Sequence, residues 1–124
     1  ESFDADLQAM IINNPLIVRV NDPRDAVASA DFIYTDTWID MQYFNDPAKH
    51  AEKTALVAQM QRFQINSDLV ADHELKIMHD MPIHNDYEIT EVAVRDPRSI
   101  IFDQAANRLH AQKGLLYWLL VANT

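Results

Sequence analysis

Aspartate side chains occur in two polar segments of the sequence that lack a regular hydrophobic period. Asp36 and Asp40 belong to the segment 36–46, and Asp80 belongs to the segment 79–86. A carboxylate can hold an ammonium group or accept a proton from it, so these residues favour chemistry on a cationic amine. The same aspartates could instead be helix caps and solvated loop residues, and the residue types alone leave both interpretations open.

Histidines raise a second possibility, a metal site, which their spacing does not favour. His79 and His84 are separated by four residues within a predicted loop, so they lack the helical i, i+4 geometry of zinc motifs. The sequence contains no cysteine, which excludes disulfides, thiolate metal sites and a cysteine nucleophile. We therefore expect no metal and no cofactor.

Length and charge narrow the class of protein. The chain has 124 residues, enough for one domain with one core, and a single glycine, Gly114, which excludes the glycine-rich phosphate loops. The net charge of −9 disfavours nucleic acid as a partner, because nucleic-acid affinity depends on Lys and Arg contacts with phosphate. No apolar run is long enough to span a membrane and no signal-peptide pattern occurs, so we expect no membrane partner and a cytoplasmic location.

Short β-branched runs alternate with amphipathic stretches four times along the chain. Such alternation predicts parallel strands joined by right-handed crossovers. We therefore expect an α/β fold, a Rossmann-like three-layer domain with a mainly parallel sheet of about four strands. The predicted helices cover residues 3–13, 23–30, 47–63, 68–73, 90–94 and 103–123, and the predicted strands cover residues 16–20, 32–35, 75–78 and 99–102.

Capping residues and turns place the polar loops within this fold. Asp22 with Pro23 predicts a helix start, as does Ser67 for the short helix 68–73. In parallel sheets, ligands bind in the crevice beyond the carboxyl ends of the strands. That rule selects the two aspartate-bearing loops and the start of the last helix near Arg108.

Three segments of the chain resemble motifs of the ornithine carbamoyltransferase family. Residues 34–41 read YTDTWIDM, which resembles the ornithine loop D-x-W-x-S-M-G of that family. Residues 79–82 read HDMP, where the family has HCLP. Residues 98–113 read RSIIFDQAANRLHAQK, which resembles the closing strand and helix of the family, P-R-S-x-x-F-x-x-A-x-N-R. The motifs occur in the order of the family, and the resemblance extends from about Leu16 to Leu120.

The resemblance implies an activity and a domain organisation. The family transfers a carbamoyl group from carbamoyl phosphate to an amine such as ornithine, in arginine biosynthesis. Residues 1–124 would form a single domain similar to the later part of the ornithine-binding domain, without the carbamoyl-phosphate domain. The expected partners are a small-molecule amine or amino acid and, in the complete enzyme, carbamoyl phosphate. We expect the isolated chain to be inactive. The alternative is a stand-alone, non-catalytic binding or oligomerisation module derived from that domain.

The resemblance also implies roles for individual residues. Asp80 falls on the cysteine beside the reacting amine, and Arg108 matches an arginine that contacts carbamoyl phosphate, which makes these two the candidate catalytic residues. Asp36 matches the aspartate that holds the α-amino group of the substrate. The bond between Met81 and Pro82 would be cis. The candidate substrate-binding residues are Asp36, Asp40, Met41, His79, Met81 and Pro82.

Several positions depart from the pattern of the family. Asp40 stands on a serine of the ornithine loop, Gln42 on its glycine and Asp80 on the cysteine. Asp40 would repel the α-carboxylate of ornithine, and Asp80 disfavours an anion such as carbamoyl phosphate. Together with Asp36, these carboxylates favour a cationic ligand without a carboxylate, such as a polyamine.

Self-association is a further expectation. A sheet without all of its neighbouring strands leaves an edge that can pair with another chain. The last predicted helix is apolar and aromatic at its end, with Leu115, Leu116, Tyr117 and Trp118. We therefore expect a homo-oligomer.

Overall fold

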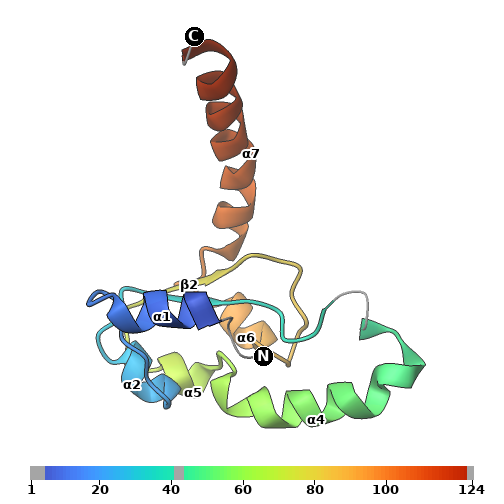
Figure 1. Cartoon of the computed structure of the whole chain (residues 1–124). Helices are drawn as coiled ribbons and strands as arrows, with labels where there is room; N and C mark the ends of the chain where they lie inside the picture. The colour runs from blue at the N-terminus through green and yellow to red at the C-terminus, as the bar shows by residue number, and fades with distance from the viewer. Residues whose placement is uncertain (1–4, 41–43, 123–124) are drawn as a thin grey trace.

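A computed structural model of the chain describes residues 5–40 and 44–122 (Figure 1). It has a small α/β body, from which one long helix rises (Figure 1). The body consists of α1 (Ala5–Asn13), α2 (Pro23–Val27), β1 (Phe32–Thr35), η1 (Pro47–Lys49), α4 (His50–Met60), η2 (Gln61–Phe63), α5 (Ser67–Val70), β2 (Lys76–His79) and α6 (Glu91–Val94). The long helix is α7 (Ile101–Tyr117), which continues as the π-helical segment η3 (Trp118–Ala122).

The two strands pair in parallel, and their register sets up the candidate site. Phe32 pairs with Lys76 at one end, and Thr35 pairs with His79 at the other. Because both strands end at the same level, the next residues, Asp36 and Asp80, leave the sheet side by side. The parallel α/β fold expected from the sequence is confirmed.

The sheet has fewer strands than expected, two within the described residues. Residues 16–20 form no strand, and Leu16 is 89% exposed, because a β-branched run without a neighbouring strand has no ladder to join. At the fourth expected strand only a parallel bridge forms, between Ser99 and Ile77, since the chain already turns into α7 at Ile101.

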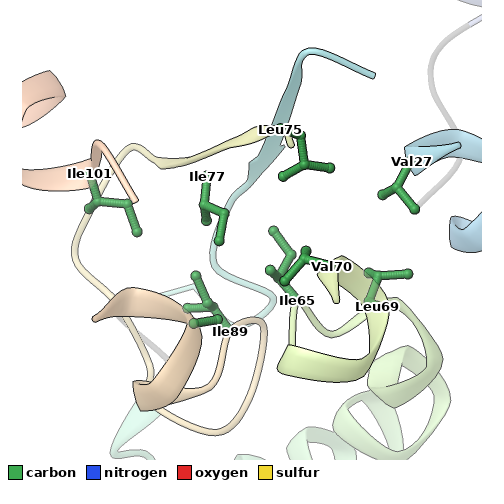
Figure 2. Packing of buried hydrophobic residues seen from close by; sticks show 9 residues of the cluster. Val27, Ile65, Leu69, Val70, Leu75, Ile77, Ile89 and Ile101 are labelled. Carbon is green, nitrogen blue, oxygen red and sulfur yellow. The ribbon is translucent and has the colours of Figure 1, made fainter. Parts of the chain in front are cut away.

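The core lies on one side of the sheet. Leu75 and Ile77 point from the β2 segment toward Ile65 and Val70, as Figure 2 shows. Full burial of each such side chain stabilises the fold by roughly 1.5–3 kcal/mol. The buried cluster consists of Val27, Ile65, Leu69, Val70, Leu75, Ile77, Ile89, Ala93 and Ile101.

The other face of the sheet is open. Phe32 and Tyr34 alternate with the half-buried Ile33 along β1, and they are 60% and 54% exposed. Of α7, only Ile101 is buried. No helix within residues 5–40 and 44–122 combines the length and the apolar character needed to cross a membrane. The three-layer arrangement expected from the sequence therefore has one bare sheet face in the part of the chain that the structure describes.

Polar side chains begin most of the short helices. Asp22 accepts the N–H of Arg24 and has Pro23 after it, as the sequence predicts. The expected cap at Ser67 is wrong by one residue, because Asn66 Oδ1 accepts the N–H of Leu69 at 3.0 Å. Ser67 is instead the first residue of α5.

Arg98 ties the segment before α7 to the core. Its guanidinium donates to both carboxylate oxygens of Asp96 and to the backbone carbonyls of Val70 and His73. The hydrogen bonds from Arg98 lower the pKa of Asp96 from 3.8 to about 2. This clamp fixes the segment that bridges to β2 and thereby the direction in which α7 leaves the body.

Candidate functional site

The carboxyl groups of Asp36 and Asp80 interact at the carboxyl ends of β1 and β2. Burial raises the pKa of Asp80 above its usual 3.8, and the neighbouring charge and hydrogen bond of Asp36 raise it further. Asp36 keeps its orientation through Oδ1, which accepts the N–H of Thr37 at 2.6 Å. The two carboxyl groups form an acidic pair, defined here as Asp36 and Asp80, whose two negative charges favour a cation.

Two hollows open on either side of the acidic pair. The first, of about 870 Å³, lies between β1, α2 and α4, and Asp36 and Asp40 supply its carboxyl groups. The second, of about 390 Å³, is lined by His79, Asp80, Met81, Gln104, Ala105 and Arg108. Because Asp36 lines the first hollow and Asp80 lines the second, the acidic pair stands where they adjoin.

The structure brings most of the candidate residues together. Asp36 and Asp40 line the first hollow, while Asp80, Met81 and Arg108 line the second. Of the remaining candidates, Met41 lies outside the described residues. The Met81–Pro82 bond is cis, as the resemblance implied, and Pro82 is exposed.

The candidate His79 has a different environment from the aspartates. Its side chain is fully buried, and its Nε2 lies 3.1 Å from Oε1 of the equally buried Glu88. Sequence reasoning did not select Glu88, because it is one acid among several in a polar segment. The only signal was its position between Tyr87 and the apolar Ile89, which is also buried.

Gln104 is a second residue that sequence reasoning missed. Its Oε1 accepts the backbone N–H of His79 at 3.2 Å, and its Nε2 donates to the hydroxyl of Tyr34 at 2.9 Å. The side chain thus ties the base of α7 to both strands. A signal was present, since Gln104 lies within the third motif, one helical turn before Arg108.

Aromatic packing fixes the far side of the site. The ring of Phe44 stacks on His84 with centroids 4.0 Å apart, and Lys53 Nζ donates to the carbonyl oxygen of Phe44 at 2.9 Å. Neither ring nitrogen of His84 has a hydrogen-bond partner among the described residues. Within those same residues, no group of three histidine, aspartate or glutamate side chains is placed to hold a metal ion.

Charge distribution decides what this arrangement can do. The acidic pair offers negative charge to an ammonium group, and Arg108 lines the same hollow as Asp80 and offers positive charge to an anion. A cationic amine and an anionic reactant can therefore be held next to each other, with a carboxylate near the amine to accept a proton.

Comparison with known proteins identifies relatives along most of the chain. The family described as aspartate/ornithine carbamoyltransferase, Asp/Orn binding domain, matches residues 3–119. The ornithine carbamoyltransferase of Mycolicibacterium gilvum is 43% identical over 103 residues, which are 82% of this chain and 32% of that protein.

Solved structures agree with the sequence matches. The ornithine carbamoyltransferase of Thermus thermophilus superposes with a TM-score of 0.65 at 36% identity, over 82% of this chain and 31% of that one. The ornithine carbamoyltransferase of Burkholderia thailandensis has a TM-score of 0.69 at 26% identity, over 97% of this chain and 36% of that one. The chain thus spans about a third of the length of the relatives that it matches.

Proposed function

The chain belongs to the aspartate/ornithine carbamoyltransferase family, as its Asp/Orn-binding domain, and from this premise we propose that it holds the amine in a carbamoyl-transfer site. Residues 1–124 act as one amine-binding domain in this proposal. The observation that carries it is the acidic pair at the adjoining ends of β1 and β2. Burial raises the pKa of Asp80 and the charge of Asp36 raises it further, and an ammonium group between the two carboxyl groups relieves their repulsion.

The proposed reaction uses residues on both sides of the second hollow. Asp80 first accepts a proton from the bound ammonium group, which leaves a neutral amine with a lone pair. The amine nitrogen attacks the carbonyl carbon of carbamoyl phosphate, a carbon–nitrogen bond forms, and the bond from that carbon to the phosphate oxygen breaks. Phosphate leaves with the electron pair and takes the second proton that the nitrogen loses. Arg108 stabilises the negative charge of the phosphate.

The proposed ligand is an amine without a carboxylate, such as a diamine. Asp40 lines the first hollow together with Asp36, so an α-carboxylate placed there would meet two negative charges. A diamine instead presents a second ammonium group to Asp40. Putrescine is the simplest probe of this class, and ornithine is its carboxylate-bearing counterpart.

Calorimetric titration of the chain with putrescine and with ornithine tests the proposal. We expect putrescine to bind more tightly, and Asp80→Asn to weaken its binding about tenfold, the effect of losing one charge-assisted contact. Asp72→Asn is the matched control, since it removes the same charge from an exposed turn before the amino end of β2. Equal or tighter binding of ornithine would refute the preference for a diamine.

Catalysis by the isolated chain is a separate question. Of the described residues that line the second hollow, Arg108 supplies the only guanidinium or ammonium group. One such group beside Asp80 holds a phosphate dianion weakly, so we propose that the isolated chain does not turn over. An assay of carbamoyl transfer with putrescine and with ornithine decides the matter, because turnover above background would overturn this part of the proposal.

The second candidate function is a non-catalytic module that self-associates. The bare sheet face at Phe32 and Tyr34 and the exposed helix α7 favour it. Residues 104–122 contain Arg108 and Lys113 but no acidic residue, whereas all nineteen acidic residues precede them. This part of the chain is therefore positively charged, and the rest carries net negative charge. Because the two charges are complementary, we propose α7 of a second copy as the occupant of the bare face. Light scattering at micromolar concentration checks this, with a dimer or larger assembly expected and a monomer contradicting it.

A further inference from the structure

Behind the loop that carries Asp80 lies a histidine–glutamate pair shielded from solvent. The side chains of His79 and Glu88 are both fully buried, with Nε2 and Oε1 3.1 Å apart. The backbone of Glu88 is held too, because its carbonyl oxygen accepts the N–H of Ile65 at 2.9 Å. A buried carboxylate depends on its hydrogen bonds, so its partners are held firmly in place.

The neighbouring hydrogen bonds determine the tautomer of His79. The backbone N–H of Met81 donates to His79 Nδ1 at 2.8 Å, so Nδ1 carries a lone pair and no hydrogen. The ring hydrogen of the neutral imidazole therefore sits on Nε2, where it points at Glu88 Oε1. Glu88 thus selects the tautomer that can accept from Met81.

Glu88 acts on both ends of the loop 79–84. At its start, Oε1 contacts the ring of His79, and at its end the same oxygen accepts the N–H of His84 at 2.6 Å. Between these points Met81 has a φ of 59°, in the left-handed region that a side chain such as methionine disfavours. Such a backbone persists only where its surroundings determine it, and the bond from Met81 to His79 does so here.

We propose that Glu88 is a positioning residue for the amine site: it fixes the tautomer of His79, His79 holds the backbone of Met81, and that backbone places Asp80 beside Asp36. This inference rests on the proposed role of Asp80 in binding the amine. Glu88 itself is fully buried and is not among the residues that line the two hollows. Its other oxygen, Oε2, is buried and has no hydrogen-bond partner among the described residues, so Oε1 carries the contacts of the relay.

Glu88→Met is the variant that separates this relay from a purely structural role. Methionine keeps roughly the length of the side chain but leaves no oxygen to accept from His79 Nε2 or from the N–H of His84. The neutral ring then loses the acceptor that holds its hydrogen on Nε2, and the tautomer with the hydrogen on Nδ1 gains population, since Nδ1 lies 3.4 Å from Asp80 Oδ1. That hydrogen faces the N–H of Met81, and two donors facing each other cannot form the hydrogen bond. In Glu88→Gln, by contrast, the amide oxygen takes the place of Oε1 and accepts from both donors, so the relay is kept.

Nitrogen NMR of the full chain measures the tautomer of His79 directly. In the wild type we expect His79 with unprotonated Nδ1 and protonated Nε2, and a Met81 amide protected from solvent exchange. In Glu88→Met we expect the other tautomer to appear, the Met81 amide to lose protection, and putrescine to bind about tenfold more weakly, the effect of one lost hydrogen bond. Glu88→Gln is the matched control, because its amide oxygen accepts from both donors and keeps the tautomer.

Several results would overturn the inference. A wild-type spectrum with the hydrogen on Nδ1 overturns it without any variant, and so do an unchanged tautomer and an unchanged Met81 amide in Glu88→Met. Should Glu88→Met fail to fold, His79→Gln replaces it, since that amide can still donate to Glu88 but has no ring nitrogen at the position that accepts from Met81. Continued protection of the Met81 amide there contradicts the relay. Wild-type chain that binds no putrescine refutes the proposed function instead, because the NMR readouts need no ligand.

Discussion

Removal of the Arg98 guanidinium is expected to cost far more stability than removal of any exposed arginine. Its Nε and Nη2 donate to Asp96 at 2.8 and 2.7 Å, and its Nη1 reaches the carbonyls of Val70 and His73. Arg98→Ala breaks all of these bonds at once. The side chains of Arg98 and Asp96 are 26% and 21% exposed, so water replaces the lost contacts only in part.

The magnitude follows from the two kinds of contact. The fall in the pKa of Asp96 from 3.8 to about 2 corresponds to roughly 2.4 kcal/mol, which partial exposure reduces to about 1–2 kcal/mol. Loss of the donor to two backbone carbonyls adds about 1–2 kcal/mol. We expect Arg98→Ala to lower the free energy of unfolding by about 3 kcal/mol in total.

Urea unfolding followed by circular dichroism measures this loss. The control is Arg95→Ala, which removes an arginine from the exposed i, i+4 pair with Glu91 and is expected to cost less than about 0.5 kcal/mol. Because the folded pKa of Asp96 is depressed, its contribution is present above pH 3.8 and is lost as the pH falls toward 2. The gap between wild type and Arg98→Ala should narrow over that range. A cost no larger than that of the control, or a gap independent of pH, would refute the reasoning.

Further predictions concern the cap of α5, the base of α7 and the acidic pair. Asn66→Ala should lower the free energy of unfolding by about 1 kcal/mol in urea, because the N–H of Leu69 loses its cap. Gln104→Ala should speed hydrogen exchange at the backbone amide of His79, whose acceptor it removes, and an unchanged rate would contradict this bond. Asp80→Asn should be at least as stable as wild type at pH 7. The pKa of Asp80 is raised in the folded chain, so its contribution to stability is present below pH 3.8 and is lost as the pH rises through the folded pKa.

The sequence predicted the fold class and the site loops because these depend on local signals. Asp22 with Pro23 starts α2 as expected, and the loops after β1 and β2 carry the predicted aspartates to one place. Strands depend on partners, which a local pattern does not contain. The run 16–20 is as β-branched as β1, yet it is exposed and forms no ladder.

The supporting residues of the site were beyond sequence reasoning for a related reason. Glu88 and Gln104 act through hydrogen bonds to residues 9 and 25 positions away, and no spacing rule reports such contacts. Glutamate and glutamine are also common on protein surfaces, so their presence in the sequence does not indicate a buried or functional side chain. Only burial, known from the fold, separates Glu88 from the exposed acids around it.

Carboxyl carbon NMR of Asp36 and Asp80, titrated with acid in the presence and absence of putrescine, tests the central claim most directly. We predict that the free chain shows Asp80 titrating above its usual range, and that putrescine lowers this pKa because an ammonium group offsets the negative charge of Asp36. The same titration with Asp36→Asn should start from a lower pKa of Asp80. Titration curves of Asp80 that are unchanged by saturating putrescine would contradict the claim that the acidic pair is the amine-binding site.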